Sequence, residues 1–394
     1  MKKGLTLGHC CEFQEGYVNP SQKEPKYFGN EVKWLRASDL NGGYVFNTER
    51  LLSDAGYRSA GKSAKMFEKD TLAISKSGTI GSLGILKERM CGNRAVINIA
   101  VNPDLSELMY VFYTLKHKKD ELVGKAGGSI QKNLYISALE TLLLNHQQLQ
   151  DQKKIAAVLS ALDAKIDCNN RINAELEALA KTLYDYWFVQ FDFPDANGKP
   201  YKSSGGKMVY NATLKREIPE GWRSKKIGDY AEVLKGDLIT ARDAKQGSIK
   251  VVAAGIDFSY THSESNRAKN TITISGSGAN AGFINFWREP IFASDCITVR
   301  GASDMETLLL LYHLKFIQSY ILSQATGSAQ PHVYPGDIRG LDYLIPGGEL
   351  IDEFGKLAIP MNDQIAKNLA ENQQLAQLRD WLLPLLMNGQ VTVA

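Results

Sequence analysis

The sequence has few cysteines, and none of them is arranged as a metal site or a disulfide framework would require. Its five cysteines are odd in number and lack CxxC spacing. Cys10 and Cys11 are adjacent, while Cys91, Cys168 and Cys296 stand apart. This pattern argues against a zinc site or a disulfide scaffold and fits a protein of the reducing cytoplasm.

Long apolar runs and a strong net charge are also missing. No apolar run approaches the roughly 18 residues that a membrane span needs. The apolar stretch after Lys2 and Lys3 is too short for a signal peptide. We therefore expect a cytoplasmic protein without a membrane partner. The formal net charge is only +3, so a polyanion has to be bound by local basic patches and not by a global field.

Motifs of some common catalytic sites are absent as well. The chain contains no GxGxxG cofactor loop and no HExxH metal motif. Neither Asn19-Pro20 nor Asn102-Pro103 continues into the proline and aromatic residue of a target-base methyltransferase motif. The sequence therefore predicts binding without catalysis, with no cofactor and no metal.

The 394-residue chain, long enough for two domains or more, contains an internal repeat. "TLAISKSG" (Thr71 to Gly78) returns as "TITISGSG" (Thr271 to Gly278) at an offset of 200. "GGSIQKN" (Gly127 to Asn133) returns as "TGSAQPH" (Thr326 to His332) at an offset of 199. Near the start, "LGHCCEF" matches "IGDYAEV" at an offset of 220, so the first copy carries about 20 extra residues early on. Matches in the same order indicate duplication.

Each copy has a globular part followed by a long helix. The globular parts are rich in β-branched runs broken by glycine, which are typical of short strands and turns. A short helix is expected around Leu108 to Lys118, with its copy around Leu308 to Gln318. We predict a first module at 1–144, a long helix at 145–190, a connector at 191–221, a second module at 222–347 and a C-terminal helix at 348–394. The connector is rich in Pro, Gly, Ser and Lys and is expected to have little regular structure.

The two long helices carry asparagines in their apolar seams. The seam of the first runs with a mean step of 3.5 residues, the coiled-coil period, and includes Asn169 and Asn173. The seam of the second includes Asn368 and Asn372. In an antiparallel pair Asn169 would meet Asn372, and Asn173 would meet Asn368. Amides that meet only in one alignment set the register of the pair; the alternative is that they are partly exposed and tolerated. Pro360 is expected to kink the second helix or to mark its true start.

This organisation resembles the specificity subunit of type I restriction–modification enzymes. The resemblance rests on two modules each followed by a long helix, and on "IPEGWRSKKIGDYAEVLKG" at the start of the second module. It implies an α+β protein with two tandem α/β target recognition domains, joined by two long antiparallel coiled-coil helices in a pseudo-twofold internal repeat. "LIPGGELIDEF" keeps the proline common at the family's helix entry, whereas "LNHQQLQDQKKIAAVL" lacks it.

The resemblance also implies a function and partners. Each domain would read one half of a bipartite site in double-stranded DNA, and the helices would act as a ruler that fixes the unread spacer. The helices would dock two modification (methyltransferase) subunits, and restriction (translocase-nuclease) subunits would join the complex.

DNA readers need cations for phosphates and short polar side chains or amides for base edges. One candidate group surrounds the glycine-serine-glutamine turn of the first copy: Lys116, Lys118, Lys125, Ser129, Gln131 and Lys132. Its copy offers Ser328, Gln330 and His332. A second group leaves the "ISKSG" and "ISGSG" strands: Ser75, Lys76, Ser77, Ser275, Ser277 and Asn280. The alternatives are a turn on a solvated basic face for the first group and ordinary strand ends for the second.

Two other functions remain open from sequence. A duplicated scaffold could bind proteins through its modules and use the helices as an assembly arm, although glycine-serine-glutamine turns suit the close approach of a ligand. A stand-alone nuclease or methyltransferase with an unrecognised site is disfavoured by the missing cofactor loop.

Overall fold

The computed structural model describes residues 5–128, 132–146, 148–324 and 331–393. The chain divides into two compact units. Unit 1 consists of Met1–Asp167 and Gln373–Ala394, and unit 2 consists of Cys168–Asn372. Each unit therefore contains one globular module and a segment of both long helices.

The module of unit 1 is built on a five-stranded sheet in the order β1-β9-β6-β7-β3. These strands are β1 (Cys11–Glu15), β9 (Val96–Val101), β6 (Thr71–Ser75), β7 (Leu83–Leu86) and β3 (Tyr44–Val45). All neighbours are antiparallel except β3 and β7. A second sheet has the order β4-β2-β8-β5, with strands β4 (Leu51–Leu52), β2 (Phe28–Leu35), β8 (Met90–Gly92) and β5 (Met66–Phe67).

The module of unit 2 repeats the central sheet with the order β13-β19-β16-β17. Its strands are β13 (Glu232–Lys235), β19 (Cys296–Arg300), β16 (Thr271–Ser275) and β17 (Ile284–Trp287). A three-stranded sheet, β15-β14-β18, comprises Phe258–His262, Ile249–Val252 and Ile291–Ala293. The pair β12 (Arg223–Lys226) and β20 (Asp342–Ile345) joins the two ends of the module.

The strand register confirms the duplication. Leu72 pairs with Ile99 between β6 and β9, and Ile272 pairs with Val299 between β16 and β19, an offset of 200 on both strands. The last three short helices of unit 1 recur in the same order in unit 2. The short helices of unit 1 are α1 (Leu7–Cys10), α2 (Asp54–Arg58), α3 (Leu108–His117), α4 (Lys119–Lys125) and α5 (Ile136–Glu140). Those of unit 2 are α7 (Asp304–Phe316), α8 (Gln318–Gln324) and α9 (Pro335–Arg339). The helices expected near Leu108 and Leu308 are thus present.

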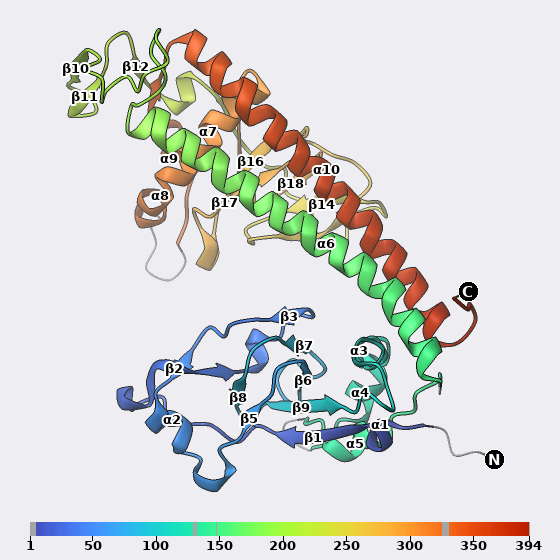
Figure 1. The fold of residues 1–394 in the computed structure, drawn as a ribbon. Coiled ribbons are helices and arrows are strands. Elements are labelled where there is room, and N and C mark those ends of the chain that lie inside the picture. The colour runs from blue at the N-terminus through green and yellow to red at the C-terminus, as the bar shows by residue number, and fades with distance from the viewer. Residues whose placement is uncertain (1–4, 129–131, 147, 325–330, 394) are drawn as a thin grey trace. The chain divides into compact units, whose positions relative to one another are not determined.

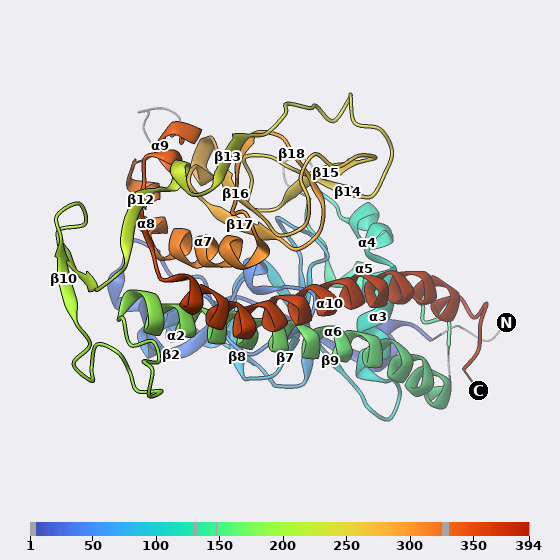
Figure 2. The same cartoon turned by 90° about the horizontal axis from the view of Figure 1, so that it is seen from above.

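The long helices are α6 (Leu149–Tyr184) and α10 (Gly348–Met387). Figures 1 and 2 show α6, in green, beside α10, in red. In unit 1, Arg379 Nη1 donates to Asp163 Oδ1 at 2.7 Å. In unit 2, Asn368 Nδ2 donates to Asn173 Oδ1 at 2.8 Å. Residues further along α6 are hydrogen-bonded to residues earlier in α10, so the two helices are antiparallel, as predicted.

Three details differ from the sequence-based expectations. Pro360 lies inside α10 and does not mark its start; it is exposed, so it faces away from the seam. The α-helical part of the first long helix ends at Tyr184. A single π-helical turn, Asp185–Val189, continues it to within one residue of the expected end at 190. The connector is not irregular throughout, because β10 (Met208–Asn211) and β11 (Arg216–Pro219) form an antiparallel hairpin.

The module of each unit packs on the helix pair through its own core. In unit 2, Phe354 of α10 is fully buried and packs edge-on against Phe188, with ring centroids 5.2 Å apart. In unit 1, Ile155 and Leu159 of α6 join Leu386 and the buried face of α3 in one cluster. Burial of such large apolar side chains is the main stabilising term in each unit.

Candidate nucleic-acid interface

The turn after β6 and the chain that enters α5 lie together in unit 1. The amide of Leu134 donates to the carbonyl of Lys76 at 2.8 Å. Gly127 and Asn133 exchange backbone hydrogen bonds of 3.0 and 2.8 Å. The motifs "TLAISKSG" and "GGSIQKN", distant in sequence, therefore meet at one place. We name this place the motif junction.

Unit 2 builds the same motif junction from the second copies. The amide of Val333 donates to the carbonyl of Gly276 at 3.0 Å, the counterpart of the Leu134 bond. The amide of Gly278 donates to the carbonyl of Pro331 at 3.1 Å, and Ser277 forms a β-bridge with His332. Because backbone bonds form it, the junction tolerates different side chains in the two modules.

The first serine of each strand-end motif is buried. Ser75 has no exposed surface; its hydroxyl donates to the Thr79 carbonyl and accepts from the Ser82 amide at 2.8 Å. Ser275 is 4% exposed and donates to the Gly255 carbonyl at 3.0 Å. The Ser75 hydroxyl holds its own turn together, and the Ser275 hydroxyl bonds the segment between β14 and β15, so burial removes both residues from the surface that a duplex can reach. The other residues of the group stay accessible in part.

The predicted cations of unit 1 have different surroundings. Lys76 Nζ donates to Glu15 Oε2 at 2.9 Å. Lys118 and Lys125 lie 3.7 and 2.7 Å from the Glu121 carboxylate, and the hydrogen bond from Lys125 is the main cause that lowers the pKa of Glu121. Since these lysines are partly neutralised, they add less positive field than their number indicates.

Lys116 and Lys132 differ in exposure. Burial on α3 lowers the pKa of Lys116, and the nearby Arg379 guanidinium lowers it further. Lys116 therefore lies near the helix pair of unit 1 and faces its charges. Lys132 is exposed beside the motif junction, and Ser77 is half-buried there. Ser129 and Gln131 lie outside the described residues.

In unit 2, two of the predicted residues, Ser277 and His332, line a pocket. Ser277 Oγ donates to Asp295 Oδ2 at 3.0 Å. The His332 ring stacks on Tyr334, with centroids 6.0 Å apart and an interplanar angle of 11°. Asn280 ends a 3₁₀ turn, and its carbonyl accepts from the Phe283 amide at 2.9 Å. Ser328 and Gln330 lie outside the described residues.

Both predicted amide pairs of the helix seam are found. Asn169 Nδ2 donates to Asn372 Oδ1 at 2.8 Å and lies 2.7 Å from Glu371 Oε2. Asn368 Nδ2 donates to Asn173 Oδ1 at 2.8 Å. Asn169, Asn173 and Asn368 are 1%, 8% and 4% exposed, so the alternative of exposed amides does not describe them. Their role in setting the register stays a proposal.

Several residues at the motif junctions were not predicted from the sequence. Glu15 and Asp295 supply the carboxylates, and Lys235 lines the pocket of unit 2. Tyr135 and Tyr334 are 52% and 57% exposed at the start of α5 and α9. The tyrosines could have been found from the repeat, because "NLY" and "HVY" align at the same offset of 199. The carboxylates carried no such signal.

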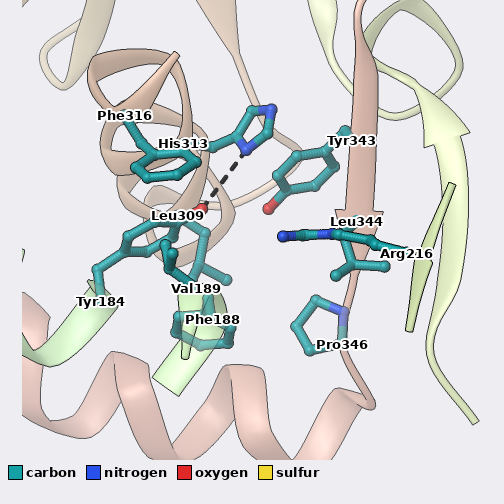
Figure 3. Close-up of a pocket in the computed structure, with 10 residues that line it drawn as sticks. All are labelled: Tyr184, Phe188, Val189, Arg216, Leu309, His313, Phe316, Tyr343, Leu344 and Pro346. Atoms are coloured by element: carbon teal, nitrogen blue, oxygen red, sulfur yellow. Dashed lines mark hydrogen bonds between the residues drawn. The ribbon is translucent and has the colours of Figure 1, made fainter. Parts of the chain in front are cut away.

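A second cavity of unit 2 is small, and Figure 3 shows side chains that line it. It measures about 40 Å³, enough for about one water molecule. The Tyr184 hydroxyl lies 3.5 Å from His313 Nδ1, and His313 Nε2 lies 3.2 Å from the Asp342 carbonyl. Arg216 of the connector hairpin points into the same space (Figure 3). Burial lowers the pKa of His313 to about 4, so the ring is neutral. Its size makes this cavity a packing feature and not a ligand site.

The fold and the paired junctions define a class of protein: duplicated α+β modules, each packed on a segment of one antiparallel helix pair. The family model "Type I restriction modification DNA specificity domain" matches residues 4–178 and 219–346, one match for each copy. The chain therefore belongs to this family, which confirms the resemblance inferred from sequence.

Individual relatives agree over nearly the full length. The type I restriction enzyme MjaIX specificity subunit of Methanocaldococcus jannaschii is 27% identical, covering 96% of this chain and 91% of that protein. A putative type I specificity subunit of Mycoplasma pneumoniae is 22% identical, covering 88% and 92%. The crystal structure of a type I S subunit from M. genitalium covers 98% of this chain and 95% of its own, with a TM-score of 0.60 at 17% identity. That structure supports the fold.

Within the part of the chain that the structure describes, no helix has both the length and the apolar composition to cross a bilayer.

Proposed function

We propose that this chain is the DNA-recognition subunit of a type I restriction–modification complex. Each module reads one half of a bipartite, asymmetric site in double-stranded DNA, and the chain itself performs no catalysis. The observation that carries this proposal is the repeated motif junction: the backbone bond from Leu134 to Lys76 recurs from Val333 to Gly276, while the side chains beside it differ. A common frame with different side chains suits the reading of two different half-sites.

The helix pair is proposed as the ruler between the half-sites. At about 1.5 Å per residue, α6 and α10 are roughly 54 and 60 Å long. Half-sites one turn of DNA apart are separated by about 34–36 Å, so the helices are long enough to span such a distance. The paired asparagines keep the two helices in one register, which keeps the length of the ruler constant.

The outer faces of the helices are proposed to dock two modification (methyltransferase) subunits, through which restriction subunits join. Several large apolar side chains are exposed there: Ile172, Leu179, Leu357, Leu369, Leu378 and Trp381. Exposed apolar groups on a helix are typical of interaction faces. A protein-binding scaffold would use the same faces, so only DNA specificity separates the two functions.

The test is methylome sequencing of a host that carries this chain with the methyltransferase of its own system. We expect one bipartite motif with two different halves. The purified chain alone should neither methylate nor cleave mixed duplexes supplied with S-adenosylmethionine. Methyl transfer by a preparation free of any second protein would contradict the non-catalytic role. A stable complex without any methylated motif would favour the scaffold.

A further inference from the structure

The two motif junctions differ at one equivalent position. In unit 1, Glu15 at the end of β1 is paired with Lys76, and their side chains are 21% and 18% exposed. The strand register places Glu15 opposite Ile97 and Lys235 opposite Ile297. The Leu134 and Val333 bonds make Gly276 the equivalent of Lys76. Unit 2 therefore has a lysine in place of the glutamate and no side chain in place of the lysine.

This exchange leaves an open pocket in unit 2. The pocket measures about 320 Å³ and is lined by Lys235, Gly276, Ser277, Asp295, His332 and Tyr334, among others. Asp295 occupies the place of Ala95 in the first copy and accepts the Ser277 hydroxyl. Lys235 is exposed, and among the described residues no carboxylate lies within 4 Å of its amine. Unit 2 thus presents an acceptor and a cation that do not neutralise each other.

The side chains of the pocket restrict what it can bind. Asp295 and Lys235 have opposite charges in one pocket, so they favour neither a simple anion such as phosphate nor a metal cation. In the major groove, cytosine presents the N4 amino donor, and its partner guanine presents the O6 and N7 acceptors. An adjacent carboxylate and ammonium are complementary to this pattern.

We propose that this pocket reads a C·G base pair in the half-site of the second module, with Asp295 accepting from cytosine N4 and Lys235 donating to guanine. The assignment rests on the proposed DNA-recognition function and adds the chemistry by which one base pair of the second half-site is recognised. Unit 1 lacks this reader, because Glu15 and Lys76 satisfy each other. The pocket therefore gives the two modules different specificities on a common backbone.

Two substitutions test the pocket by different routes. Asp295→Asn keeps the shape and the acceptor for Ser277 but replaces the carboxylate by an amide with its own donor. Gly276→Lys restores the side chain of unit 1 and places its amine near Asp295. A Cβ on Gly276 would meet no atom closer than 3.8 Å, so the substitution fits the backbone. Asp229→Asn, at an exposed carboxyl of the same module, is the charge-matched control.

The measurement uses the assembled complex with its own methyltransferase and a duplex library randomised across both half-sites. We expect each pocket variant to lose roughly ten- to a hundredfold discrimination for C·G at one position of the second half-site, the range of a good base contact. The first half-site, the melting temperature and the control variant should be unchanged. If one variant fails to assemble, the other still decides the result.

Two results would overturn the proposal. One is an unchanged second half-site in variants that still methylate; the other is a wild-type second half-site without a required C·G pair. Both leave DNA recognition intact. A wild-type complex that methylates no specific site would instead refute the proposed function, and the pocket assignment with it.

Discussion

At the scale of residues, the seam amides form two unequal groups. Asn173 and Asn368 share one hydrogen bond, and Asn368 Oδ1 also accepts from the exposed Gln364 at 2.8 Å. Among the described residues, Asn173 Nδ2 is buried without a partner. Asn169 and Asn372 belong to a wider network, because Asn169 also donates to Glu371 and Asn372 Nδ2 donates to Asn170 Oδ1 at 2.8 Å. Buried polar groups destabilise a fold unless they are satisfied, so the two groups should respond differently to substitution.

Leucine substitutions should reveal this difference. Asn368→Leu alone leaves the Asn173 amide buried without its donor and should cost about 1–3 kcal/mol of unfolding free energy. Adding Asn173→Leu removes the remaining amide and should recover most of the loss. The double substitution at Asn169 and Asn372 should not recover, because Glu371 loses a donor and Asn170 loses one as well. Urea unfolding of the single and double variants gives a double-mutant cycle for each asparagine pair. Additive losses of unfolding free energy at Asn173 and Asn368 would contradict their pairing.

His313 should make stability depend on pH. Burial lowers its pKa from the ordinary 6.5 to about 4, so the unfolded chain binds a proton that the folded chain does not between these values. The stabilising contribution is complete above about pH 6.5 and falls by about 3 kcal/mol as the pH drops to 4. His313→Gln should flatten this part of the curve. Equal slopes in wild type and His313→Gln would contradict the expectation.

At the scale of elements, the two long helices are joined by a charged pair in unit 1 and by an amide pair in unit 2. Asp163 pairs with Arg379 in unit 1 and Asn169 with Asn372 in unit 2. The Asp163 carboxylate also accepts from the Tyr113 hydroxyl at 2.7 Å, which ties α3 to the helix pair. In unit 2 the equivalent position is Asn362, which accepts from Arg288 Nε at 2.8 Å. Different polar contacts thus hold each module on the same helices.

The ruler can be tested by lengthening both helices together. A seven-residue insertion after Lys165 in α6 and another after Leu375 in α10 keep the heptad phase and both flanking pairs. Each adds about 10 Å, close to three base pairs at about 3.4 Å each. The methylated motif should keep both halves and gain about three base pairs of spacer.

An insertion in α6 alone serves as the control. It cannot satisfy both flanking pairs, so the complex should assemble poorly or melt at a lower temperature. An unchanged spacer in the doubly lengthened protein would refute the ruler.

At the scale of the whole molecule, each module has its own sheet, core and motif junction. Modularity of this kind predicts independent half-sites. Exchanging residues 222–347 for the second module of another family member should change one half of the methylated motif and leave the other half as it was. The measurement is methylome sequencing of the hybrid, with the parent complex as reference. A change in both halves would mean that the modules share one reading surface.

Much of this architecture was accessible from sequence because its signals are local and periodic. The apolar period identified the helices, and the repeat identified the two modules. Matching heptad positions predicted that Asn169 faces Asn372, since an antiparallel pair has few registers that bury both amides. The repeat also brought out the glycine-serine-glutamine motifs, although it could not show that they meet the strand ends.

The tertiary structure decided which side chains remain available at the junctions. Ser75 and Ser275 looked like accessible strand-end residues, yet turn formation buries them. Lys76 looked like a cation for phosphate, yet β-sheet register brings Glu15 against it. The same register places Lys235 near Asp295 and Gly276 and opens the pocket of unit 2. Sequence patterns report spacing along one element, whereas pairing between strands far apart in the chain depends on the packed fold.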